Sequence, residues 1–276
     1  MPRGPWSGKQ LLLGLSWAIF LQVTTTALFI AILTATSHAF HLEDSGDDVF
    51  DRAGSIWRWG DERLKAASDG VALPEPPRIF ADVTSLKIGF ATTMVYELGL
   101  VGLCYVFARK NSIGESLRAL RLREFSFDEL WTPIGMVIVM YAFVVGWGLF
   151  AEYTDIDLLK PRSNVPEPIV RDGVALAMAG VLACILAPFS EELFFRGFLF
   201  RGLLRWGFWP AAALSGFVFS LAHLSTGALI PFWIVGMTLA WLAWRRGRMW
   251  DAIVFHFLFN TTSYVLLATG AGGRNV

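Results

Sequence analysis

Long apolar runs divide this chain into segments of membrane-spanning length. The first, from Leu11 to Leu33, contains no Asp, Glu, Lys or Arg. Together the runs predict seven spans, at about 10–36, 88–108, 131–150, 174–195, 209–224, 229–244 and 249–269. A helix of about 20 apolar residues crosses the hydrocarbon core of a bilayer, where backbone polar groups must be satisfied within the segment. The pattern therefore predicts an all-α polytopic membrane bundle of about seven transmembrane helices.

Composition supports the membrane interpretation. Hydrophobic residues make up 55% of the 276 positions before the 26 glycines are counted, whereas soluble domains reach about 45–50% with glycine included. Charged residues make up 17%, and 23 basic residues balance 23 acidic ones. A chain without net charge has no long-range field that would attract nucleic acid. We therefore expect the lipid bilayer as a partner, and no nucleic acid.

The placement of basic residues predicts an orientation and a division of the chain. Arginine and lysine residues follow the second, fourth and sixth predicted spans. Short cytoplasmic loops retain such charges, so we expect a cytoplasmic N-terminus. The small number of cysteines, two, suits a bacterial inner membrane. We divide the chain into two parts. Residues 1–173 hold three spans, an acidic outer loop at 37–87 and a basic inner segment at 109–130, and residues 174–276 form a core of four spans.

Three ionisable residues stand close together in the fourth predicted span. An ionisable side chain at the bilayer centre costs about 2.5–3.5 kcal/mol on insertion scales, so a compensating interaction is expected. Glu192 and Arg196 are four residues apart and can pair on one helix face. Glu191 lies about 100 degrees further round the helix, which leaves its carboxylate to point elsewhere. We interpret the Glu192 and Arg196 pair as support that positions Glu191, in a helix that Pro188 can kink.

Two other predicted spans contribute polar residues of the kind that enzymes use. Phe219 and His223 lie at the end of the fifth span, and His256 and Asn260 share a face of the seventh. Polar residues within membrane helices face the interior of the bundle. The three helices are therefore expected to converge on one site inside the membrane.

The order of these residues resembles the motif set of the CPBP intramembrane proteases. The motifs are Glu191-Glu192-x-x-x-Arg196, Phe219-x-x-x-His223 and His256-x-x-x-Asn260, over roughly residues 174–269. That family includes the type II CAAX prenyl endopeptidases and the bacterial bacteriocin-processing and immunity (Abi) proteins. The resemblance implies an intramembrane endopeptidase that uses Glu191, with His223 beside it and His256 and Asn260 across the cavity.

The chemistry of such a site can be argued from the residues themselves. Amide hydrolysis without a serine or cysteine nucleophile needs an activated water, and a carboxylate in a medium of low dielectric becomes a stronger base. We assign that role to Glu191, with His223 sharing the proton. His256 and the amide of Asn260 can supply two donors to the developing oxyanion from one helix face.

A metal-dependent mechanism would use the same residues differently. One carboxylate and two histidines, here Glu191, His223 and His256, make a plausible catalytic zinc shell. Members of the resembled family have been described both as metalloproteases and as glutamate-type proteases. The usual His-Glu-x-x-His zinc signature is absent from the sequence. We favour a mechanism without a cofactor, with one bound zinc as the alternative.

Two other classes of membrane protein remain as alternatives. A catalytically silent immunity or scaffold protein would use the same motifs to bind a partner peptide. A transporter would also carry buried carboxylates and histidines, but it typically shows repeated halves and broken helices, which we do not find. The substrate class stays open between prenylated C-terminal tails, leader peptides and sorting signals, of which prenylated tails suit a bacterial enzyme least. We expect a membrane-associated or exported peptide or protein, and the oligomeric state stays open.

Overall fold

The computed structural model describes most of the helical part of the chain. The described residues are 6–40, 83–108, 113–122, 130–160, 167–223 and 225–270, with residue 4 and short stretches or single positions within 58–74 and at 125 and 127. Across these ranges all regular structure is helical and no strand occurs. The predicted acidic outer loop at 37–87 falls largely outside them. Of the predicted basic inner segment, the described part includes the short helix α4 (Ile113–Ala119).

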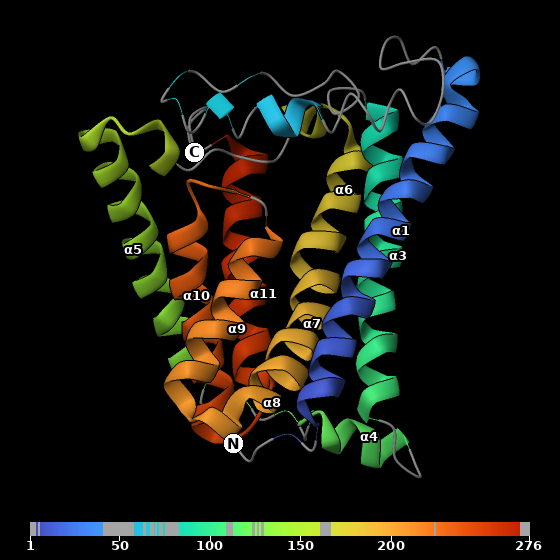
Figure 1. Cartoon of the computed structure of the whole chain (residues 1–276). Coiled ribbons are helices and arrows are strands. Elements are labelled where there is room, and N and C mark those ends of the chain that lie inside the picture. The colour runs from blue at the N-terminus through green and yellow to red at the C-terminus, as the bar shows by residue number, and fades with distance from the viewer. Residues whose placement is uncertain are drawn as a thin grey trace.

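Each predicted span coincides with a helix (Figure 1). The helices are α1 (Gly8–Phe40), α3 (Val83–Ala108), α5 (Trp131–Thr154), a compound fourth helix over 173–206, α9 (Phe208–Ala222), α10 (Leu229–Arg246) and α11 (Trp250–Thr269). In the described part of the chain, five of them are long and apolar enough to cross a membrane; α9 and α10 are not among these five. The predicted all-α polytopic bundle is confirmed.

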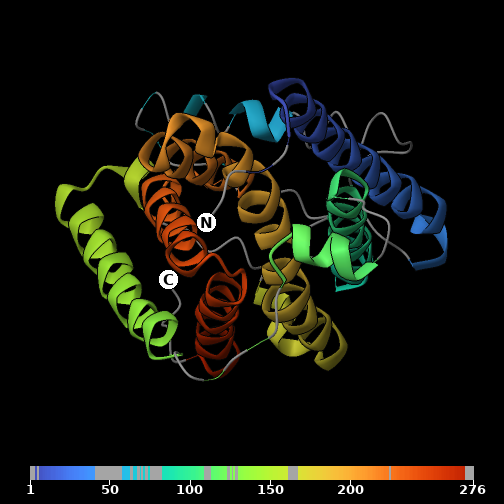
Figure 2. The same ribbon diagram turned by 90° about the horizontal axis from the view of Figure 1, so that it is seen from below.

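The helices run between two ends of the bundle. Figure 1 shows α1 beginning at the lower end, where α4 and α8 (Arg201–Leu203) also lie, and α11 ending at the upper end. Seen from below in Figure 2, α1 and α3 lie together on one side and α5 lies on the opposite side. The fourth helix, α10 and α11 lie between them. The central helices are therefore flanked by α1 and α3 on one side and by α5 on the other.

The fourth helix alternates between normal and wide turns. It consists of α6 (Gly173–Val181), η4 (Leu182–Leu186), α7 (Ala187–Glu191), η5 (Glu192–Phe200), α8 and η6 (Leu204–Trp206), of which η4 and η5 are π-helical. Such wide turns are rare and often occur at functional sites. The predicted span ends at 195, whereas the helix continues to Trp206, and the Glu192 and Arg196 pair is buried within it.

An ion pair fixes the upper end of the fourth helix to α3. Asp172 precedes α6, and its Oδ1 accepts a hydrogen bond from the backbone N–H of Ala175 at 2.8 Å. Its Oδ2 lies 2.8 Å from the Nζ of Lys87 on α3. The hydrogen bond from Lys87 holds the pKa of Asp172 below its ordinary value. The same carboxylate therefore caps α6 and links it to α3.

Two glycines let α9 and α10 approach closely. A Cβ atom on Gly236 would lie 2.7 Å from the Cα of Gly216, and one on Gly216 would lie 3.0 Å from the backbone nitrogen of Met237. Both distances involve backbone atoms, which cannot move aside as a flexible side chain can. Small residues commonly allow membrane helices to pack at such short range. The absence of a side chain at Gly236 and Gly216 therefore lets the backbones of α9 and α10 come into contact.

We expect Gly236→Ala to destabilise the protein, because the added methyl group forces α9 and α10 apart. Overpacking of this kind costs about 1–3 kcal/mol. Gly148→Ala on α5 is the matched control, since a Cβ at Gly148 meets nothing within 4 Å. Thermal unfolding of the purified variants in detergent measures the difference. A Gly236→Ala protein that melts like the parent would contradict the close contact.

Candidate active site

A fully buried ion pair lies at the centre of the site. Arg196 Nη1 donates a hydrogen bond to Glu192 Oε1 at 2.8 Å, and both side chains are 0% exposed. Arg196 Nη2 donates to the backbone carbonyl of Gly236 at 3.1 Å. The pair predicted from the spacing of four residues is therefore confirmed. Its second acceptor comes from α10, at the position where α9 and α10 cross closely.

The ring of Phe219 packs against the charged groups and both histidines. The guanidinium carbon of Arg196 lies 4.3 Å from the ring centroid, a cation–π distance. The ring centroids of His223 and His256 lie 4.6 and 5.8 Å away, and that of Phe195 lies 5.3 Å away. Phe219 itself is 2% exposed. This side chain from α9 therefore joins the fourth helix to α11.

His256 lies between the two neighbouring glutamates. Its Nδ1 is 3.0 Å from Glu192 Oε1, and its Nε2 is 4.0 Å from Glu191 Oε2. A carboxylate ionised by its arginine partner accepts hydrogen bonds, so Nδ1 carries the proton and donates to Glu192. In neutral His256, Nε2 is then an acceptor that faces Glu191.

Glu191 is more accessible than Glu192, Arg196 and His256. Its side chain is 16% exposed, compared with 0% for Glu192 and Arg196. Its Oε2 is buried and makes no hydrogen bond with the described residues. Buried carboxylate oxygens are normally satisfied by protein or by water. An unsatisfied oxygen opposite His256 Nε2 is therefore a natural place for a polar reactant.

His223 follows the last residue of α9 and joins the group through Phe219. Its Nδ1 lies 2.8 Å from the Phe219 carbonyl oxygen. A carbonyl oxygen can only accept, so this Nδ1 carries the proton, and Nε2 is the acceptor when the ring is neutral. We expected His223 to be the histidine beside Glu191, and the structure places His256 within 4.0 Å of that carboxylate.

Asn260 holds α11 against the fourth helix. Its Nδ2 donates to the carbonyl oxygen of Ala183 at 2.8 Å, in the wide turn η4. We expected Asn260 and His256 to act as paired oxyanion donors. His256 instead faces two carboxylates, and one N–H of the Asn260 amide is engaged by Ala183.

Sequence reasoning missed Glu97 and Ser190. The Ser190 hydroxyl donates to Glu97 Oε2, and these side chains are 1% and 4% exposed. Glu97 is the one charged residue in the predicted span 88–108. An ionisable residue inside a membrane span is a functional candidate by default, so the signal that would have found Glu97 was present.

The three residues considered as zinc ligands were Glu191, His223 and His256. Among the residues that the structure describes, no group of three or more His, Cys, Asp or Glu side chains is arranged to hold a metal ion. Nδ1 of His256 is engaged by Glu192, and its Nε2 lies 4.0 Å from Glu191 Oε2. Whether this site binds a metal stays a prediction.

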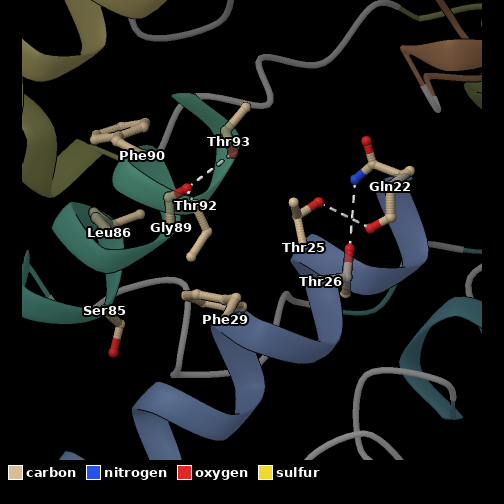
Figure 3. Close-up of a pocket in the computed structure, with 10 residues that line it drawn as sticks. All are labelled: Gln22, Thr25, Thr26, Phe29, Ser85, Leu86, Gly89, Phe90, Thr92 and Thr93. Carbon is tan, nitrogen blue, oxygen red and sulfur yellow. Dashed lines mark hydrogen bonds between the residues drawn. The ribbon is translucent and has the colours of Figure 1, made fainter. Parts of the chain in front are cut away.

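A separate cavity of about 280 Å³ lies between α1 and α3 (Figure 3). It is lined by Gln22, Thr25, Thr26, Phe29, Ser85, Leu86, Gly89, Phe90, Thr92 and Thr93. The hydroxyls of Thr25, Thr92 and Thr93 donate to carbonyl groups of their own helices. None of the predicted site residues lines it. We therefore assign this cavity to helix packing rather than to the active site.

We expect Glu192→Ala and Arg196→Ala each to lower thermal stability, because each leaves the opposite charge buried without its partner. Breaking a fully buried pair costs about 3–5 kcal/mol. The double variant should melt above the less stable single variant, since it leaves neither charge stranded. Asp155→Ala is a control, as Asp155 pairs with Lys160 but its side chain is 87% exposed. Single variants that melt like the parent would show that water reaches the pair.

Comparison with known proteins supports the resemblance seen in the motifs. Residues 173–262 match the family model described as type II CAAX prenyl endopeptidase Rce1-like. This segment runs from the start of α6 into α11 and contains every predicted site residue. Glu97 on α3 lies outside it. The match therefore covers the central helices and leaves the N-terminal spans unassigned.

One curated relative is a Bacillus subtilis (strain 168) protein described as "Putative membrane peptidase YdiL". It is 25% identical over 148 residues, which are 53% of this chain and 59% of the relative. The similarity thus extends over less than two thirds of the relative. No solved structure matches the chain. The motifs and the family match agree, and residues 173–262 of this chain are similar to the type II CAAX prenyl endopeptidases.

Proposed function

We propose that this protein is an intramembrane endopeptidase that hydrolyses a peptide bond with Glu191 as the general base. The observation that carries the proposal is the pair of atoms Glu191 Oε2 and His256 Nε2, 4.0 Å apart inside the bundle. The match of residues 173–262 to the type II CAAX prenyl endopeptidase model supports the reaction class. The name of the curated relative refers to a membrane peptidase, which agrees with it.

Two acceptors at this distance can bind the two hydrogens of one water molecule. A contact of 4.0 Å is too long for a direct hydrogen bond and suits a bridging water. Such a water would point a lone pair of its oxygen away from Glu191 and His256, towards a substrate carbonyl. Glu191 and His256 would then both orient the nucleophile and raise its reactivity.

In this mechanism Glu191 carries the proton in both steps of the hydrolysis. As the water oxygen bonds to the carbonyl carbon, Glu191 accepts one of its protons. When the carbon–nitrogen bond breaks, the same proton passes to the leaving amine, and the carboxylate is regenerated. We assign support of the oxyanion to the second N–H of Asn260 and a proton-sharing role to His223.

The buried pair has a supporting role in this scheme. Glu192 accepts from Nδ1 of His256 and from Arg196 at the same oxygen. It thereby fixes the ring orientation and leaves Nε2 of His256 unprotonated. A carboxylate behind a histidine does the same in other hydrolases, where it holds the imidazole in the correct tautomer.

We propose a membrane-associated or exported peptide or protein as the substrate, because the reactive atoms lie within a bundle of membrane helices.

We also propose that the bundle end that carries Arg205, Arg245 and Arg246 faces the cytoplasm of a bacterial cell. These residues lie at the ends of η6 and α10, on the side where α1 begins. The rule that positive charges stay inside supports this orientation.

We expect Glu191→Gln and His256→Ala to lower peptide-bond cleavage by about 10²- to 10⁴-fold, because each removes a group that handles the water. The measurement is the appearance of new peptide termini, by mass spectrometry, when purified protein is incubated with peptides derived from a bacterial membrane fraction. Glu152→Gln is the control, since Glu152 is exposed on α5. Equal cleavage by the parent and Glu191→Gln proteins would reject the proposed base, and no cleavage by any of them would favour a silent scaffold.

We expect cleavage to be independent of metal. Chelation with 1,10-phenanthroline should leave the rate unchanged, and the purified active protein should contain far less than one zinc per chain by elemental analysis.

The metal-free reaction depends on Asn260 as an oxyanion donor, so Asn260→Ala should lower kcat by about 10²- to 10³-fold with KM little changed. One zinc per chain, with activity lost on chelation and regained only with metal, would contradict this mechanism.

A further inference from the structure

A carboxyl group from the N-terminal half of the chain reaches the turn that carries Glu191. Glu97 lies in the middle of α3, and its side chain is 4% exposed. Leu100 and Cys104, three and seven residues further along the same helix, are each 1% exposed. Burying an ionisable group among apolar side chains is unfavourable unless it serves a specific interaction.

The hydrogen-bond partner of Glu97 is the residue immediately before Glu191. The Ser190 hydroxyl donates to Glu97 Oε2. The same hydroxyl oxygen lies 2.8 Å from the Leu186 carbonyl of its own helix. Ser190 is 1% exposed, so water does not compete for the contact. The interaction therefore joins α3 directly to α7.

This turn of the fourth helix needs an external attachment. α7 has only five residues and lies between the π-helical segments η4 and η5. Pro188 within it has no N–H to donate to the helix. Wide turns are rare and often occur at functional sites, and Glu191 directly precedes one of them, so a contact from another helix to this turn can help to fix the direction of Glu191.

We propose that Glu97 is a positioning residue of the active site, which holds the Ser190 turn so that Glu191 faces His256 Nε2. This role rests on the proposed endopeptidase function. It assigns a part in the reaction to α3, which lies outside the segment that matches the family. Glu97 acts through Ser190 and does not itself meet the substrate.

The test is a double-mutant cycle read in both turnover and stability. We expect Glu97→Ala and Ser190→Ala each to lower kcat at least tenfold with KM little changed, since a small displacement of a reacting group slows the chemical step strongly. The double variant should be no slower than the slower single variant, because both changes break one contact. Glu97→Gln keeps an acceptor oxygen for Ser190 and should restore kcat to within about threefold of the parent.

The control variant on the same helix is Thr93→Ala. Thr93 is exposed and its hydroxyl donates to Gly89 of its own helix, so kcat should not change. Additive effects of Glu97→Ala and Ser190→Ala on kcat would overturn the proposal, as would a parent-like kcat in either single variant. A Glu97→Gln protein as slow as Glu97→Ala would also overturn it.

Failure of the proposed function would be recognised separately. The melting temperatures of the parent, the two single variants and the double variant can be compared without a substrate. Their coupling reports only the contact between Glu97 and Ser190. If the parent cleaves no peptide while the melting temperatures show coupling, the endopeptidase function is rejected, and the positioning role with it, although the contact is real. If the parent cleaves and the kcat cycle is additive, only the role of Glu97 is rejected.

Discussion

The arrangement of the central helices depends on the need to satisfy one buried guanidinium. Arg196 is 0% exposed in the middle of a membrane helix. It finds a carboxylate on its own helix, a backbone carbonyl on α10 and an aromatic ring face on α9. A charge left unpaired at this depth would cost several kcal/mol, so these three elements cannot separate without a large penalty.

The same constraint accounts for features that look unrelated in the sequence. The glycine at 236 brings a backbone carbonyl within reach of Arg196, and a glycine at 216 on the facing helix makes room for it. Glu192 uses one oxygen for both Arg196 and His256, which attaches α11 to the group. Packing and electrostatics therefore specify one arrangement together, and a change in either would disturb the other.

The hydrophobic pattern predicts most of this architecture, because crossing a bilayer requires long apolar helices. The pairing of Glu192 with Arg196 was also predictable, since a spacing of four residues places two side chains on one helix face. The position of His256, rather than His223, beside Glu191 was not. Spacing shows which residues share a face, but the distance from a histidine to a carboxylate on another helix depends on how the helices are rotated against each other.

Two further features lay beyond a pattern of hydrophobicity. The wide turns η4 and η5 change the backbone hydrogen-bond register without changing which residues are apolar. The fourth helix also continues to residue 206, beyond the predicted end at 195. Arg196 can lie within it because Glu192 and the Gly236 carbonyl accept its hydrogen bonds inside the bundle.

Exposure increases steadily along the chain of contacts from the buried pair to the reactive end. Arg196 and Glu192 are 0% exposed, the His256 side chain is 5% exposed and that of Glu191 is 16% exposed. The gradient therefore distinguishes the two adjacent glutamates. Glu192 is buried against Arg196 and His256, whereas Glu191 is partly exposed, which agrees with its proposed role as the general base.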